Sequence, residues 1–325
     1  MICGCNADVS RRHCAIRFSF AILLFPLLFG CRTWNTERAI AAYNQGNILR
    51  EVGKRADSIS YYRQALEYKP GMTAAAYNLA LVLGIDSESS ADLELSGTGA
   101  LAPRENVEEA IELLEMLLRR DPRNLTVLRA LGWVSWRGGQ PDVALEYYQA
   151  ALAIFPADEI ALKALCEIYE AQNQLGKALE NRRYLVKLAD DSESRINLAG
   201  ITALRGDKRE ALRLYDDALF DSESIQALKG AAEISEELGL YRRAVGYRTR
   251  LLNAGDDSID GWWHMARLRL SKIDDYEGGF EALERAMNEG FSDMELIEVL
   301  EGEVPAAVKE AIRERVEAQL NSGEL

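Results

Sequence analysis

The chain has 325 residues, of which 48% are hydrophobic and 28% charged, and its 38 basic against 52 acidic side chains give a net charge of −14. This composition is that of a globular protein with enough chain for a sizeable core, and the acidic balance argues against nucleic acid as a partner. Two histidines, His13 and His264, are too few for a histidine-rich metal site.

The first thirty residues have the layout of an export signal. Three arginines, at positions 11, 12 and 17, precede an apolar run over residues 18–29. A transmembrane helix needs about twenty apolar residues, so this shorter run favours a secretory signal peptide over residues 1–30. The alternatives to a lipoprotein signal, whose cleavage site is described next, are an uncleaved anchor and an ordinary cleaved secretory signal.

The end of this segment, Leu28-Phe29-Gly30-Cys31, resembles the lipobox of bacterial lipoproteins. The resemblance implies cleavage before Cys31, lipidation of that cysteine, for example with palmitate, and attachment to a membrane through the lipid. Residues 31–38 would then be a lipidated tether. Because Arg32 follows the cysteine and the aspartate that retains some lipoproteins in the inner membrane is absent, the resemblance favours the outer membrane, facing the periplasm.

The remaining cysteines fit this processing. Cys3, Cys5 and Cys14 lie in the segment to be removed, so only Cys166 would stay as a thiol in the mature chain, and no intramolecular disulfide is expected. Cys3 and Cys5 lack the second pair that a zinc site needs.

A small residue recurs in helical segments along the rest of the chain, with spacings of 52, 34, 34, 33, 33 and 35 residues, at Ser58, Ala110, Ala144, Ala178, Ala211, Ala244 and Gly279. A second small residue lies twelve positions earlier in five of the units, at Gly46, Gly132, Cys166, Ala199 and Ala232. A period near 34 resembles that of the tetratricopeptide repeat (TPR). The resemblance implies an all-α TPR solenoid of about seven helix-turn-helix repeats over residues 39–291, starting near residues 39, 73, 125, 159, 192, 225 and 259.

Two segments interrupt or follow the repeats. Residues 85–105 account for the one long spacing, carry small polar residues, and are predicted to be a mobile loop and the preferred site of limited proteolysis. Residues 292–325 are predicted to be a helical cap, with Ser292 and Glu295 as a capping box and Pro305 in the first turn of the last helix. Its apolar face would cover the end of the solenoid with Val308, Ile312, Val316 and Leu320.

The sequence contains no motif for catalysis, cofactors or metals. Gly-x-Ser-x-Gly, His-Glu-x-x-His and a Walker loop are all missing. We expect His264 to be a packed or surface histidine and Cys166 to be a buried thiol. The pair Glu108-Glu109 is expected to lie on a solvated helix surface. We therefore expect no enzyme, no cofactor, no metal and no small-molecule substrate.

The TPR resemblance also implies a binding surface, because the first helix of each repeat lines the inner surface in this family. The candidate groove residues are Tyr43, Asn47, Tyr77, Asn78, Arg129, Trp133 and Trp136. Thr126 and Ala130 occupy two places of the family's basic carboxylate clamp, so an apolar or extended segment is expected rather than a free C-terminus. The alternative for Trp133 and Trp136 is packing between neighbouring repeats.

These features predict a lipid-anchored TPR adaptor that binds a protein or peptide partner at the bacterial cell envelope, for example in the assembly of an envelope complex. A structural envelope lipoprotein without a dedicated ligand is the first alternative. A periplasmic enzyme or enzyme subunit is the second.

Overall fold

The computed structural model describes residues 34–84, 103–255 and 258–322. Three predictions lie outside these residues: the signal peptide, lipidation at Cys31, and most of the insertion at 85–105. None of the helices in the described ranges is long and apolar enough to cross a membrane.

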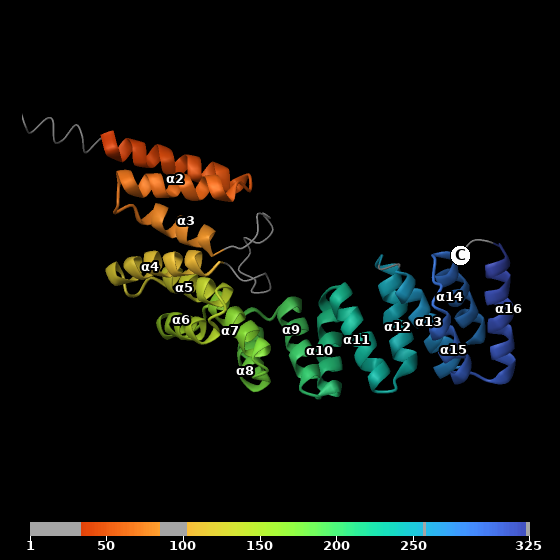
Figure 1. The fold of residues 1–325 in the computed structure, drawn as a ribbon. Coiled ribbons are helices and arrows are strands. Elements are labelled where there is room, and N and C mark those ends of the chain that lie inside the picture. Colours follow the sequence, from red (N-terminus) through yellow and green to blue (C-terminus); the bar gives the residue numbers. More distant parts are fainter. Residues whose placement is uncertain (1–33, 85–102, 256–257, 323–325) are drawn as a thin grey trace, which may run out of the picture. The chain divides into compact units, whose positions relative to one another are not determined.

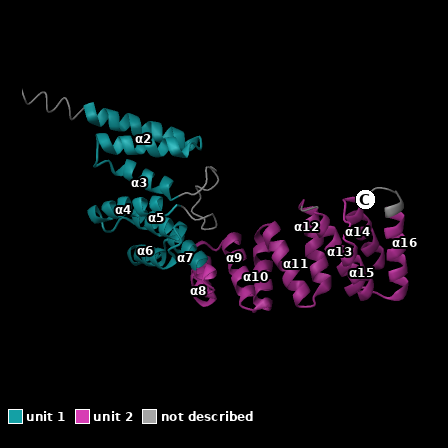
Figure 2. Cartoon of the chain, viewed as in Figure 1, with its two compact units in different colours: residues 1–168 teal, residues 169–325 magenta. Residues whose placement is uncertain are grey.

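The described residues form helices joined by short turns, without strands (Figure 1). The chain divides into two compact units, residues 1–168 and 169–325, with the boundary inside α7 (Figure 2). The first unit contains a helix over residues 34–51, α2 (Arg55–Tyr68), α3 (Thr73–Leu83), α4 (Arg104–Arg120), α5 (Leu125–Arg137), α6 (Pro141–Ile154) and most of α7 (Glu159–Ala171). The second contains α8 (Leu175–Ala189), α9 (Ser192–Leu204), α10 (Lys208–Asp221), α11 (Ile225–Glu237), α12 (Tyr241–Asn253), α13 (Ile259–Lys272), α14 (Tyr276–Asn288), α15 (Met294–Glu303) and α16 (Ala306–Ser322).

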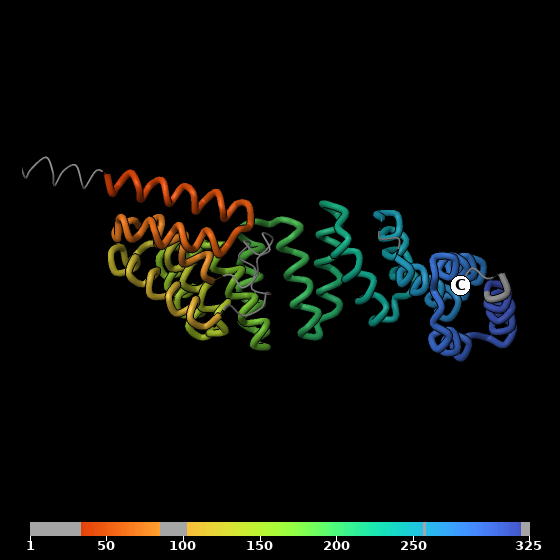
Figure 3. Tube along the Cα trace, turned by 45° about the horizontal axis from the view of Figure 1, so that its top comes forward, coloured from red at the N-terminus to blue at the C-terminus, as the bar shows by residue number. Residues whose placement is uncertain are grey.

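First and second helices of the repeats alternate along the chain, as predicted. Six first helices begin at the residues proposed from the sequence, which are Thr73, Leu125, Glu159, Ser192, Ile225 and Ile259. Within the second unit, α9 to α12 stand side by side and reverse direction at each turn (Figure 3). This confirms the all-α solenoid of helix-turn-helix repeats.

Two predicted boundaries need correction. Residues 34–38 are helical rather than part of a tether, and the Arg38 guanidinium lies 4.9 Å from the Trp34 ring centroid and 5.6 Å from that of Tyr68. These cation–π contacts explain why the first helix extends below residue 39. The second helix of the next repeat, α4, begins at Arg104, so the last two residues of the proposed insertion are helical.

Small residues allow the two helices of a repeat to approach closely. The predicted positions on the second helices are fully buried at Ser58, Ala110, Ala144, Ala178, Ala211 and Ala244. On the first helices, a Cβ at Gly132 would lie 2.8 Å from the Tyr148 ring, and one at Gly46 would lie 2.7 Å from the Tyr62 ring. At these two positions glycine leaves the room that a tyrosine of the second helix fills.

Wherever the structure describes the turn inside a repeat, that turn has a left-handed residue at one recurring position. The positive φ angles are 76° at Gly53, 71° at Gly139, 56° at Asn173, 94° at Gly206, 73° at Gly239 and 57° at Asp274. The amide that follows this residue donates back to the end of the first helix, as from Leu240 to the Ser235 carbonyl at 2.8 Å. This arrangement ends a helix and reverses the chain, which favours glycine or Asn/Asp there.

The C-terminal segment contains two helices, α15 and α16. Val308, Ile312 and Val316 of α16 are buried in one apolar cluster with Phe291 and Leu300, so the segment covers the last repeat as expected. The predicted N-cap residue of α15 is wrong by one position. Asp293, not Ser292, caps α15, and its carboxylate accepts a hydrogen bond from the Leu296 amide at 3.1 Å.

Candidate functional site

Four polar side chains link the first two repeats. Asn78 of α3 donates through Nδ2 to the Asn47 Oδ1 atom at 2.9 Å and to the Tyr43 hydroxyl at 3.2 Å. The Tyr62 hydroxyl donates to the same Asn47 Oδ1 at 2.9 Å, and its ring centroid lies 6.1 Å from that of Tyr43. Burial raises the pKa of Tyr62, so its hydroxyl remains a donor at neutral pH. The structure thus brings three predicted groove residues together.

The two asparagines of this network keep unused hydrogen-bonding groups. Among the described residues, no partner lies within reach of the Asn47 Nδ2 group or the Asn78 Oδ1 atom. Both side chains are half-buried. One donor and one acceptor therefore remain at the surface of adjacent first helices, which is what the backbone of an extended peptide can pair with.

Tyr77 and Arg129 lie next along the same series of first helices. Tyr77 is half-buried against the core, and burial raises the pKa of its hydroxyl while the nearby Arg129 lowers it. Arg129 donates through Nε to Asp158 at 2.7 Å, and Asp158, 1% exposed, also accepts the Ala161 amide at 3.2 Å in the first turn of α7. Arg129 is therefore held in place and presents a fixed cation beside an aromatic ring.

The two tryptophans of α5 differ in environment. Trp133 is 3% exposed and belongs to the core of the first unit, where a Cβ added at Gly84 would lie 2.8 Å from its ring. This is the packing between neighbouring repeats that the sequence analysis kept as an alternative. Trp136 is half-buried. We define the first-helix surface as the remaining predicted residues, Tyr43, Asn47, Tyr77, Asn78, Arg129 and Trp136.

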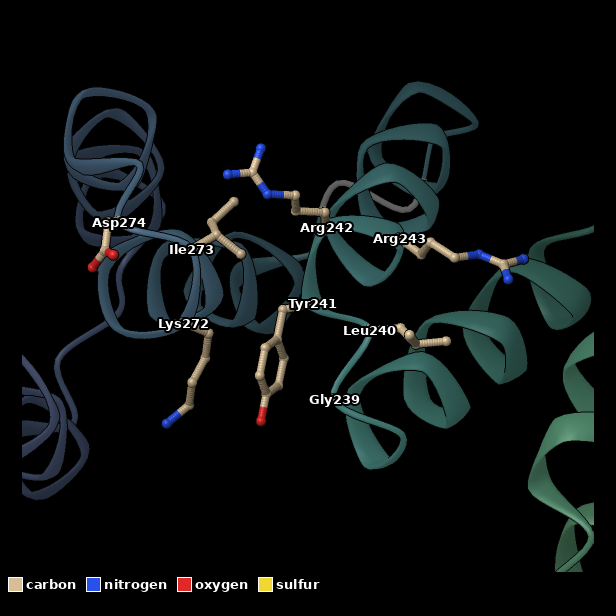
Figure 4. A pocket seen from close by; sticks show the side chains of 8 residues that line it. All are labelled: Gly239, Leu240, Tyr241, Arg242, Arg243, Lys272, Ile273 and Asp274. Atoms are coloured by element: carbon tan, nitrogen blue, oxygen red, sulfur yellow. The ribbon is translucent and has the colours of Figure 1, made fainter.

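A depression in the second unit was not predicted from the sequence. About 440 Å³ in volume, it lies between the α11–α12 turn and the α13–α14 turn and is lined by Gly239, Leu240, Tyr241, Arg242, Arg243, Lys272, Ile273 and Asp274 (Figure 4). The sequence signal that could have indicated it is the run of apolar and basic residues at the start of α12.

Side chains that could bind a metal ion or take part in catalysis are few in the described part of the chain. No three His, Cys, Asp or Glu side chains there lie close enough together to hold a metal ion. Burial, and next to it the charge of Arg248, lowers the pKa of His264, so this half-buried imidazole is neutral at pH 7. Cys166 is fully buried in α7.

Comparison with known proteins agrees with this architecture. A family model of the tetratricopeptide repeat matches residues 43–83 and 100–159. The crystal structure of a tetratricopeptide repeat protein from Parabacteroides merdae aligns with a TM-score of 0.52 at 14% sequence identity, covering 87% of this chain and 99% of that chain. The repeats within residues 43–83 and 100–159 therefore match the tetratricopeptide repeat, and the fold of the chain is a TPR solenoid.

The curated relatives that match are much longer. Protein O-mannosyl-transferase TMTC1 is 24% identical over 203 residues in Homo sapiens and 24% identical over 205 residues in Mus musculus. The match covers 55% of this chain and 23% of the human protein or 21% of the mouse protein, so the chain spans less than a quarter of these relatives. TPR solenoids have extended surfaces on which other proteins can bind, and this chain has that fold.

Proposed function

We propose that the protein is a lipid-anchored adaptor of the bacterial cell envelope and that its first-helix surface binds an extended segment of a partner protein. The lipid would be attached at Cys31, and the chain would face the periplasm from the outer membrane. The lipobox resemblance of residues 28–31 supports the anchor, and Arg32 in place of a retention aspartate supports the outer membrane.

One observation carries the binding proposal. Asn47 and Asn78 are locked by a shared network, yet each leaves one amide group without a partner in the described ranges. A donor and an acceptor fixed in this way match the alternating groups of an extended backbone, and the preformed network lowers the entropy cost of binding. Tyr77 and Trp136 supply the aromatic contacts that interfaces favour.

Site-specific crosslinking tests this proposal. A photoreactive phenylalanine replaces Tyr77, or in a second variant Trp136, and cells are irradiated before the membrane proteins are separated. We expect one dominant crosslinked product from both variants. The matched control places the same group at Glu112, an exposed residue of α4 in the same unit, and should give no such product.

The same experiment separates the alternatives. A structural lipoprotein without a dedicated ligand would give a diffuse set of products from all three positions. Equal crosslinking from Glu112 and from Tyr77 would therefore contradict a specific first-helix surface.

A further inference from the structure

A second depression lies beside the first at the turns of the second unit. Next to the depression at the α11–α12 turn lies another of about 380 Å³, lined by Arg209, Leu212, Arg213, Asp216, Leu238, Leu240 and Arg243. The two depressions share Leu240 and Arg243 as lining residues, so they lie side by side along α10, α12 and the end of α13. We call the two neighbouring depressions together the basic trough.

The lining of the trough is richer in basic than in acidic side chains. Its lining has five basic side chains, Arg209, Arg213, Arg242, Arg243 and Lys272, against the acidic Asp216 and Asp274. The whole chain, by contrast, has a net charge of −14. Positive charge that is not already paired with an acidic side chain favours a negatively charged ligand, so the ion pairs of these basic groups decide how much charge is available.

Intramolecular ion pairs engage only some of these basic groups. Arg243 pairs with Asp216 at 2.6 Å, and Lys272 pairs with Glu303 at 3.1 Å. Arg213 pairs with acidic residues of its own helix. Arg209 and Arg242, in contrast, have no ion-pair or hydrogen-bond partner among the described residues, and both are exposed.

These two arginines are equivalent in the repeat. Arg209 is the second residue of α10 and Arg242 is the second residue of α12, one repeat further along the chain. The trough therefore offers two uncompensated guanidinium groups in successive repeats. A single extended chain with two separated acidic groups could contact both.

Apolar surface lies between the two arginines. Leu240 is 40% exposed and belongs to both depressions, and half-buried Tyr241 and Ile273 line one of them. Figure 4 shows Tyr241 and Lys272 extending in the same direction from neighbouring turns. A polyanion without apolar groups would leave Leu240 in water, and a flat anionic membrane would not fill a hollow between turns. An acidic peptide with an apolar side chain satisfies both parts of the trough.

We propose that the basic trough binds an extended acidic segment of a partner protein, with carboxylates at Arg209 and Arg242 and an apolar side chain over Leu240. The trough lies in the second unit, whereas the first-helix surface lies in the first. The two sites are therefore independent, and either can fail without the other.

Binding of a designed probe to the purified full-length protein tests this proposal. The probe is a panel of fluorescein-labelled peptides in which Glu and Asp alternate with Leu at several spacings, and binding is followed by fluorescence anisotropy at low and high salt. We expect at least one peptide to bind, with an affinity that falls as salt rises. Its counterpart with Gln and Asn in place of the acids should bind at least tenfold more weakly.

Variants assign that binding to the trough. Arg209→Glu combined with Arg242→Glu should weaken binding by tenfold or more, because both groups are exposed and the fold does not depend on them. The matched control, Arg120→Glu combined with Arg123→Glu, changes the same charge at exposed positions of the first unit and should retain most of the affinity. Leu240→Ser removes the apolar contact and supplies a favourable N-cap for α12, so it should weaken binding several-fold without lowering the melting temperature.

Three results would overturn the proposal. The first is that no peptide of the panel binds, and the second is that the trough and control variants lose affinity equally. The third is that heparin or phosphatidylglycerol vesicles bind in the same assay as tightly as the best peptide and are equally sensitive to the trough variants, because the ligand would then be a general polyanion or a membrane surface.

Discussion

The contact between Gly132 and Tyr148 predicts the cost of adding a single methyl group. In Gly132→Ala the new Cβ would lie 2.8 Å from two atoms of the Tyr148 ring and 2.9 Å from a third. Real Cβ atoms essentially never approach so closely, and Tyr148 is 1% exposed between α5 and α6, so the ring has no free space to enter. The helices must therefore move apart.

Two opposing effects set the magnitude. Overpacking of a core costs about 1–3 kcal/mol, whereas replacing glycine by alanine inside a helix contributes about 0.5–1 kcal/mol of stability. The net expectation for Gly132→Ala is a loss of about 0–2.5 kcal/mol in the free energy of unfolding, with about 1 kcal/mol at the middle of the range. Urea denaturation followed by circular dichroism measures it.

A matched control isolates the steric effect. Gly246 lies in the interior of α12, is exposed, and a Cβ there would meet nothing within 4 Å. Gly246→Ala should therefore raise stability by about 0.5–1 kcal/mol, which is the helix-propensity gain alone. If Gly132→Ala also raises stability, the reasoning is refuted.

A second substitution tests the assigned partner. Combining Gly132→Ala with Tyr148→Leu should give a smaller loss than the sum of the two single losses, with a coupling of about 0.5 kcal/mol or more. Strict additivity would show that the alanine clashes with something other than the tyrosine ring.

Three further predictions concern other residues. Trp133→Ala should lower the free energy of unfolding by about 3–5 kcal/mol because its ring is buried in the core, while Trp136→Ala should cost far less; equal losses would contradict their different environments. Hydrogen bonding to Arg267 lowers the pKa of Glu303 to about 2 from its ordinary 4.5, so its stabilising effect is present above pH 4.5 and is lost as pH falls towards 2. Glu303→Gln should therefore reduce stability at pH 7 by roughly 1–3 kcal/mol, with the difference from wild type shrinking across that range; a constant difference down to pH 2 would refute the linkage. Cys31→Ala should abolish incorporation of labelled fatty acid and release the protein from the membrane fraction, and unchanged labelling would rule out the lipid anchor.

The repeat was predictable from sequence because close packing of its two helices requires particular residue types at particular positions. Two helices that cross closely admit only small residues where they touch. Small residues that recur with the period of the repeat, such as Gly132 and Ala144, therefore mark the crossing. The starts of six first helices followed from that register. Fine boundaries did not, because Ser292 and Asp293 are both good caps and only the local backbone decides between them.

The candidate sites were predictable only in part. A repeat pattern assigns Trp133 and Trp136 to similar surface positions, but the side chain that enters the core depends on the neighbouring repeat, here on the space beside Gly84. The hydrogen bonds of Asn47 likewise required the structure. The basic trough combines turns of successive repeats, so neither Arg209 nor Arg242 signals it alone.

The contacts of the second unit run mainly between consecutive helices, from α9 with α10 to α13 with α14. Such a unit has low contact order, and folding can begin in any helix pair and spread to its neighbours. For the same reason, a destabilising substitution should affect mainly the helix pair in which it lies. Excising one whole repeat, such as residues 192–224, would bring α8 next to the equivalent face of α11, so the number of repeats is a quantity that insertion or deletion can alter without redesigning the fold.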